Sequence, residues 1–88
     1  GQCRALEIVN QGSGWVQIDW KEPADGGKVA AYKIQRSENG EAFADVATAI
    51  ESEAVLINQP TMTNLTYKVR AVNKAGEGLE SNTISIVL

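Results

Sequence analysis

The fold is decided by residues 15–36, WVQIDWKEPADGGKVAAYKIQR, in which two runs of alternating apolar and polar residues flank a turn. The first run carries Ile18 and Trp20 on one parity, and the second carries Tyr32 and Ile34 on one parity. A period of two places alternate side chains on opposite faces of a strand. The proline and glycines between the runs stop one strand and reverse the chain. We therefore expect two strands, each with one buried face.

The rest of the chain repeats this pattern in short segments bounded by glycine, proline and asparagine. Residues 42–49 also suit a helix by propensity, but their short length and the flanking turns favour a strand. Seven short strands without a convincing helix predict an all-β, seven-stranded antiparallel immunoglobulin-like sandwich. The predicted strands are residues 5–11, 15–21, 30–37, 43–47, 53–58, 65–72 and 82–88. The predicted core residues are Trp20, Tyr32, Ile34, Tyr67, Val69 and Ala71.

Length and composition limit the classes of protein to consider. The 88 residues are 43% hydrophobic and 22% charged, which is typical of one folded domain over residues 1–88. The net charge of −3 is dispersed, without a basic face for nucleic acid. No apolar run reaches the roughly 20 residues of a membrane-spanning helix, so membrane insertion is not expected. Because the chain begins with Gly1 rather than Met, we expect it to be excised from a longer protein.

The residue types argue against catalysis and against metal or cofactor binding. There is no histidine, the commonest general base and zinc ligand, and the single cysteine, Cys3, excludes an internal disulfide. We expect Cys3 to be a partly exposed terminal thiol without a role, with an intermolecular bridge as the alternative. Asp19, Asp25 and Asp45 are too scattered for a calcium loop. Asn64-Leu-Thr is a glycosylation acceptor sequence, relevant only in a secreted eukaryotic protein.

Three stretches carry a resemblance to a known family. Residues 20–34 resemble the second and third strands of fibronectin type III domains, and residues 67–81 resemble the sixth strand and the loop after it. Phe43 with Val46 is similar to the aromatic-x-x-Val of the family. The resemblance covers nearly the whole chain, and the loop 73–81 is similar in style to domains of bacterial multidomain proteins.

One position departs from the family pattern. The family usually has a tyrosine eight residues before the position of Asn73, and this tyrosine bonds the backbone of the preceding loop to form a corner. Leu65 stands there instead, and the nearest tyrosine is Tyr67. We expect the corner to be lost, with Tyr67 buried and its hydroxyl bonded elsewhere than in the loop 59–63.

The resemblance places two loops, residues 24–28 and 73–80, at one end of the sandwich, where many immunoglobulin-like domains recognise partners. Neither the Arg-Gly-Asp tripeptide of integrin ligands nor the paired Trp-Ser motif of cytokine receptors is present. The glycines have a simpler explanation in turn geometry. The candidate binding residues are Asp25, Gly26, Gly27, Lys28, Lys74, Gly76, Glu77 and Gly78.

Trp15 is the one candidate contact outside these loops. Its parity is opposite to that of Trp20, so it points outward or caps a sheet edge. An exposed indole can stack on a sugar or on a neighbouring domain, although single exposed apolar residues are common.

The resemblance implies a non-catalytic module without cofactors, monomeric in isolation, that spaces or positions neighbouring domains of a larger extracellular or surface protein. The alternative is a recognition domain that binds a protein or a glycan through the loops 24–28 and 73–80.

Overall fold

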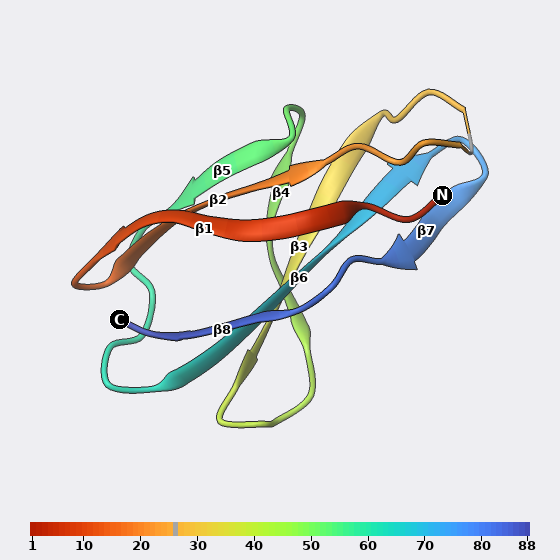
Figure 1. Cartoon of the computed structure of the whole chain (residues 1–88). Helices are drawn as coiled ribbons and strands as arrows, with labels where there is room; N and C mark the ends of the chain where they lie inside the picture. The colour runs from red at the N-terminus through yellow and green to blue at the C-terminus, as the bar shows by residue number, and fades with distance from the viewer. Residues whose placement is uncertain (26) are drawn as a thin grey trace.

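The computed structural model describes residues 1–25 and 27–88, which form two antiparallel sheets packed face to face (Figure 1). One sheet has three strands in the order β1-β2-β5, and the other has five, in the order β4-β3-β6-β7 with β8 also paired to β6. The predicted all-β sandwich is therefore confirmed. Within the described residues, no helix is long and apolar enough to cross a membrane. The strands are β1 (Arg4–Gly12), β2 (Trp15–Lys21), β3 (Ala31–Glu38), β4 (Ala44–Ala49), β5 (Glu53–Leu56), β6 (Asn64–Asn73), β7 (Gly76–Glu80) and β8 (Ile84–Val87).

The described residues contain eight strands rather than seven because the predicted loop 73–80 is largely strand. A tight turn, in which the Asn73 side chain accepts a hydrogen bond from the Ala75 N–H at 2.8 Å, sends the chain back as β7. At Ser81, between β7 and β8, the N–H donates to the Val69 carbonyl at 2.9 Å and the side-chain oxygen accepts from the Val69 N–H at 2.9 Å. β7 and β8 are thus two parts of one edge beside β6.

The core is formed by the inward faces of the two sheets. Trp20, on β2, meets Tyr32, on β3, edge to face, with ring centroids 5.2 Å apart. This contact joins the sheets directly, and aromatic pairs in this geometry add stability beyond the area that they bury. The six predicted core residues all lie among the buried ones, which are Cys3, Leu6, Val16, Ile18, Trp20, Tyr32, Ile34, Leu56, Leu65, Tyr67, Val69, Ala71 and Ile86.

The prediction that Cys3 is partly exposed is wrong, because its side chain is 1% exposed. The first residues of the chain lie along β7: Gln2 forms a bridge with Leu79, and its side chain donates to the Glu80 carbonyl at 2.9 Å. These contacts hold the first residues against β7, so that the Cys3 side chain is buried in the core. Burial raises the pKa of the Cys3 thiol, which makes the thiolate scarce at neutral pH.

The expectation about Tyr67 is also wrong in one respect. Tyr67 is fully buried as expected, but its hydroxyl donates to the side-chain oxygen of Gln59 at 2.5 Å, in the loop where no bond was expected. The same oxygen accepts from Arg36 Nη1 at 2.8 Å, and the Gln59 N–H donates to the Gly14 carbonyl at 2.8 Å. Gln59 therefore connects β3 and β6 of one sheet to the β1–β2 turn of the other. A corner is therefore present, in which the Tyr67 hydroxyl donates to the Gln59 side chain rather than to the backbone of the loop.

A second carboxamide joins the sheets along the side where β1 faces β8. The Asn82 oxygen accepts from the Leu6 N–H at 2.9 Å, and the Asn82 nitrogen donates to the Leu6 carbonyl at 3.0 Å. One side chain thereby satisfies both backbone groups of a β1 residue that lies within the irregularity of the β1–β2 ladder between Arg4 and Glu7. This bond pair fixes the edge of the three-stranded sheet to the five-stranded sheet.

We expect Trp20→Ala to lower the free energy of unfolding by about 3–5 kcal/mol, because it empties the contact between the sheets. Trp20→Phe should cost clearly less, since the indole N–H has no hydrogen-bond partner among the described residues. Chemical denaturation monitored by circular dichroism measures both. An unchanged denaturation midpoint for Trp20→Ala would contradict the central role of this residue in the contact between the sheets.

We expect Gln59→Ala to cost about 1–3 kcal/mol, because it leaves the buried Tyr67 hydroxyl without its acceptor. Tyr67→Phe removes that hydroxyl, so the double variant should cost less than the sum of the two single variants by at least about 0.5 kcal/mol. Gln11→Ala, at an exposed position, is the matched control. Strictly additive costs in denaturant titrations would contradict the bond between Gln59 and Tyr67.

Candidate functional site

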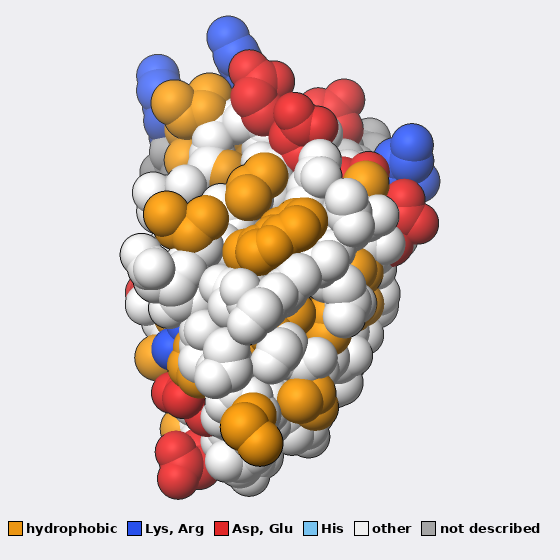
Figure 2. Space-filling view, turned by 90° about the vertical axis from the view of Figure 1, so that its left-hand side faces the viewer, with side chains coloured by type: hydrophobic (Ala, Val, Ile, Leu, Met, Phe, Trp, Pro, Cys, Tyr) orange, Lys and Arg blue, Asp and Glu red, His pale blue; other side chains and the backbone are white. Residues whose placement is uncertain are grey.

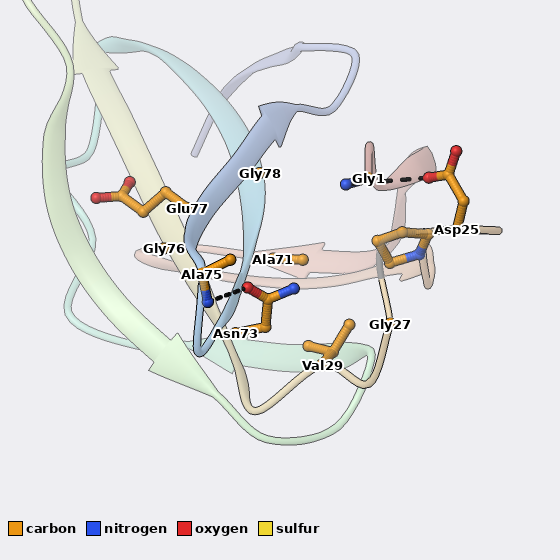
Figure 3. Close-up of a pocket in the computed structure, with 11 residues that line it drawn as sticks. Gly1, Asp25, Gly27, Val29, Ala71, Asn73, Ala75, Gly76, Glu77 and Gly78 are labelled. Carbon is orange, nitrogen blue, oxygen red and sulfur yellow. Dashed lines mark hydrogen bonds and ion pairs between the residues drawn. The ribbon is translucent and has the colours of Figure 1, made fainter.

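The two predicted loops lie together around a shallow cavity of about 210 Å³ at the end of the sandwich that holds the N-terminus (Figure 3). The segment after β2 supplies one wall and the β6–β7 turn supplies the other. Gly26 lies outside the described residues, so its place is not assigned. The cavity is lined by Gly1, Pro23, Asp25, Gly27, Val29, Ala71, Asn73, Ala75, Gly76, Glu77 and Gly78.

The narrowness of this cavity comes from the close passage of the N-terminal residue. A Cβ at Gly78 would collide with the carbonyl oxygen of Gly1, so only glycine fits at position 78 without a shift of the backbone. On the other side, the Asp25 carboxylate lies 3.9 Å from the Gly1 amino group (Figure 3). Gly1 thus occupies the space between the two loops.

The charged candidates of the loops divide into two groups. Glu77 accepts a hydrogen bond from Lys33 Nζ at 3.0 Å, and its carboxylate points away from the cavity in Figure 3. Lys28 and Lys74 are exposed and, within the described residues, form no ion pair. Both line a second, more open hollow of about 500 Å³, next to the cavity.

The described residues at this end offer charge, backbone hydrogen bonds and shape. Among the described residues, no group of three metal-ligating side chains lies together. The cavity is smaller than the roughly 300–1,000 Å³ of typical ligand sites. The two exposed lysines, Lys28 and Lys74, lie at the more open hollow rather than in this cavity.

Trp15 is half-buried at the opposite end of the molecule. Its indole covers Gly12, its partner across the β1–β2 hairpin, where a Cβ would collide with the ring nitrogen. The indole therefore packs on the backbone of its own hairpin, and only part of it is open to a partner.

The outer face of the five-stranded sheet carries a network of paired charges that was not evident in the sequence. Lys33 Nζ lies 3.0 Å from Glu77 and 3.5 Å from Asp45. Glu80 is 2.7 Å from Lys68 Nζ and 3.2 Å from Arg70 Nη2. These contacts cross from β4 to β7, so the charges on this face neutralise one another.

The pKa values on this face shift as such pairing requires. The hydrogen bond to Glu77 raises the pKa of Lys33. A hydrogen bond from the Gln35 side chain, aided by Lys33, lowers the pKa of Asp45, and a hydrogen bond from Lys68 lowers the pKa of Glu80. Each shift favours the charged form at neutral pH.

The outer face of the three-stranded sheet is different. Glu7 on β1, Asp19 on β2 and Glu53 on β5 stand directly opposite one another in register, so three carboxylates form a row across the sheet. In the described part of the chain, none of the three is in an ion pair. We call these residues the acidic row. Like charges in directly opposed positions destabilise a sheet.

Exposed apolar side chains lie beside the acidic row and in the connections around β5. Val55 is 58% exposed, Ile57 65% and Ile50 83%. Val55 and Ile57, which share one parity in the sequence, thus lie on the outer face, while Ala54 and Leu56 turn inward. Sequence reasoning missed this surface because the acidic row exists only once the register of three strands is known.

Comparisons with known proteins point to one family. The sequence profile described as "Fibronectin type III domain" matches residues 2–87. No curated protein sequence matches the chain significantly.

Solved structures with the same fold include larger proteins. A structure of titin kinase and its flanking domains matches with a TM-score of 0.90 and 24% identity, over 98% of this chain and 16% of that one. The twitchin kinase region from C. elegans matches with a TM-score of 0.92 and 23% identity, over 98% and 16%. The fibronectin type-III domain of human fibronectin type III domain containing protein 3 has a TM-score of 0.81 and 18% identity, over 97% and 82%. The chain thus spans less than a fifth of the titin and twitchin structures.

We expect acid to weaken the fold partly through Glu80. Because its pKa is lowered in the folded state, the stabilisation is fully present above the ordinary carboxyl pKa and is lost as pH falls through the lowered value. Glu80→Gln should lower the melting temperature at neutral pH and reduce its decline on acidification. Glu41→Gln, on the exposed turn before β4, is the control. Identical pH profiles for Glu80→Gln and the unmodified chain would contradict the role of the charge network.

Proposed function

The chain belongs to the fibronectin type III family, and from this premise we propose that it is a non-catalytic module that positions neighbouring domains in a longer extracellular or cell-surface protein. The module comprises residues 1–88. Its own residues supply rigidity rather than chemistry, and its partners are the domains joined to its two ends.

The observation that carries this proposal is the placement of the termini. The molecule extends 38 Å along its longest axis and 24 and 18 Å along the others, and the N- and C-termini lie toward opposite ends of it (Figure 1). Domains joined at both ends would be held apart by the length of the sandwich. A packed two-sheet core maintains that separation better than a flexible linker does.

The C-terminal end offers a surface suited to a following domain. Figure 2 shows the side that holds the β1–β2 turn and the C-terminus, where apolar side chains are spread over the face from its upper part to its lower end and charged ones lie mainly at its edges. Met62 is 92% exposed, and its N–H donates to the Leu88 carbonyl at 3.2 Å, close to where a continuing chain would leave. Val87, the residue before Leu88, is 58% exposed. A domain following Leu88 would cover these side chains.

The extracellular location is part of the proposal and is what the family resemblance implies. Asn64 is exposed at the first residue of β6, so its acceptor sequence lies at the surface. Mass spectrometry of the native polypeptide can detect a glycan on this residue, and its presence would support passage through the secretory pathway.

A second candidate function is recognition of a protein or glycan through the end that holds the loops. Its specific support is the pair of exposed lysines, Lys28 and Lys74, beside the 500 Å³ hollow. Glu77 is a poorer choice for testing this function because it is bonded to Lys33. The double variant Lys28→Ala/Lys74→Ala would abolish such binding while leaving the charge network intact.

The positioning function predicts a defined separation of the flanking domains in the native polypeptide, whose mass and flanking sequence are established first. Small-angle X-ray scattering should then show a narrow distribution of distances between the flanking domains. Replacing the module by a Gly/Ser linker of equal residue number should broaden it, since such a chain has an r.m.s. span of about 50 Å with wide variation. An unchanged distribution, or a native polypeptide without flanking domains, would overturn the proposal and leave the recognition function as the better candidate.

A further inference from the structure

We propose that the free edge of β5 binds an extended segment of a partner protein with alternating basic and aliphatic side chains, which joins the three-stranded sheet as a fourth strand. This interaction is independent of the positioning function, because it uses the side of the sandwich rather than its ends.

The backbone of β5 is suited to such pairing. Among the described strands, β2 is its one partner, in antiparallel register. The Trp20 N–H donates to the Ser52 carbonyl at 3.1 Å, so residue 52 faces β2. Backbone groups alternate in direction along a strand, and residues 54 and 56 therefore also face β2. The N–H and C=O groups of Glu53 and Val55 consequently point toward the open edge.

A groove of about 490 Å³ runs beside this edge and can receive the side chains of an added strand. Its lining includes Thr48 and Ala49, at the end of β4, and Ala54 and Val55, on β5. Ile50 supplies a further apolar wall. Because Ile50 and Val55 remain largely exposed, covering them with an aliphatic side chain would be favourable.

The charges around the groove indicate what kind of segment fits. Glu51 and Glu53 line it, and Glu53 is also the end of the acidic row with Asp19 and Glu7. A lysine or arginine opposite Glu53 would neutralise a carboxylate that has no ion-pair partner in the described part of the chain and would relieve the repulsion within the row.

The same charges argue against a second copy of the chain as the occupant. Pairing two β5 edges would bring two copies of Glu51 and Glu53 together, and the chain already carries a net charge of −3. Exposed strand edges are the usual sites for addition of a peptide strand, where backbone bonds give affinity and alternate side chains give specificity. Charge complementarity therefore selects a basic segment.

Amide hydrogen exchange measured by NMR tests the proposal directly. In the free protein, the amides of Glu53 and Val55 should exchange rapidly, and those of Ala54 and Leu56 slowly. The probe is a blocked hexapeptide of alternating lysine and valine, and the control peptide has glutamate in place of lysine. With the lysine peptide at about 1 mM, exchange at Glu53 and Val55 should slow by about tenfold or more. No protection, or equal protection by both peptides, would overturn the proposal.

One pair of variants tests the role of the backbone N–H of residue 55. Val55→Pro removes an N–H that faces the open edge without touching the ladder to β2, and should abolish binding. Val55→Thr keeps that N–H and is the matched control, with affinity for the lysine peptide close to that of the unmodified chain. Binding retained by Val55→Pro would overturn the proposal.

Glu53→Lys preserves the backbone and serves if the proline variant does not fold. It should weaken binding of the lysine peptide by about tenfold and improve binding of the glutamate peptide. Equal affinities of this variant and the unmodified chain would contradict charge selection. Concentration-dependent protection of Glu53 and Val55 without any peptide would identify a second copy as the occupant and overturn the basic-segment assignment.

Discussion

The packing of Trp20 against Tyr32 is the contact on which the rest of the sandwich depends. These residues lie on consecutive strands of different sheets, so their contact fixes how the chain crosses from one sheet to the other. Once the inner faces are opposed, the polar groups at the margins must find partners inside the protein. Gln59 provides one for Tyr67, and Asn82 provides two for Leu6. Apolar packing thus sets the arrangement of the sheets, and two carboxamides fix their edges.

The sequence predicts the features that depend on local periodicity. The alternation around Trp20 and Val69 predicts strands with one buried face, and the number of such short segments predicts the sandwich. It does not predict that Cys3 is buried or that Gln59 accepts from Tyr67, because both depend on distant parts of the chain. The candidate loops lie together in the structure, but the acidic row required a register that no local pattern encodes. The glycines of residues 73–80 predicted a loop, but they lie in β7, because a strand that is paired on one side tolerates glycine.

The two outer faces have opposite electrostatic character. On the five-stranded sheet, every acidic residue of the network is bonded to a cation, which leaves little for another molecule to neutralise. On the three-stranded sheet, the acidic row and Val55 are left to solvent. Neighbouring domains at the two ends and a basic segment at the β5 edge would contact different residues. One small module could therefore hold its place in a chain and engage a separate protein at the same time.

The buried thiol of Cys3 gives this fold an internal reporter of its own opening. It is the single cysteine of the chain and is 1% exposed, so a thiol reagent can reach it only when the first residues separate from β7. When reclosing is faster than modification, the labelling rate measures the equilibrium between closed and open forms of that segment. A domain attached before Gly1 would pull on these same residues. The labelling rate of the Cys3 sulfur would then report how strongly that preceding domain strains the N-terminal segment.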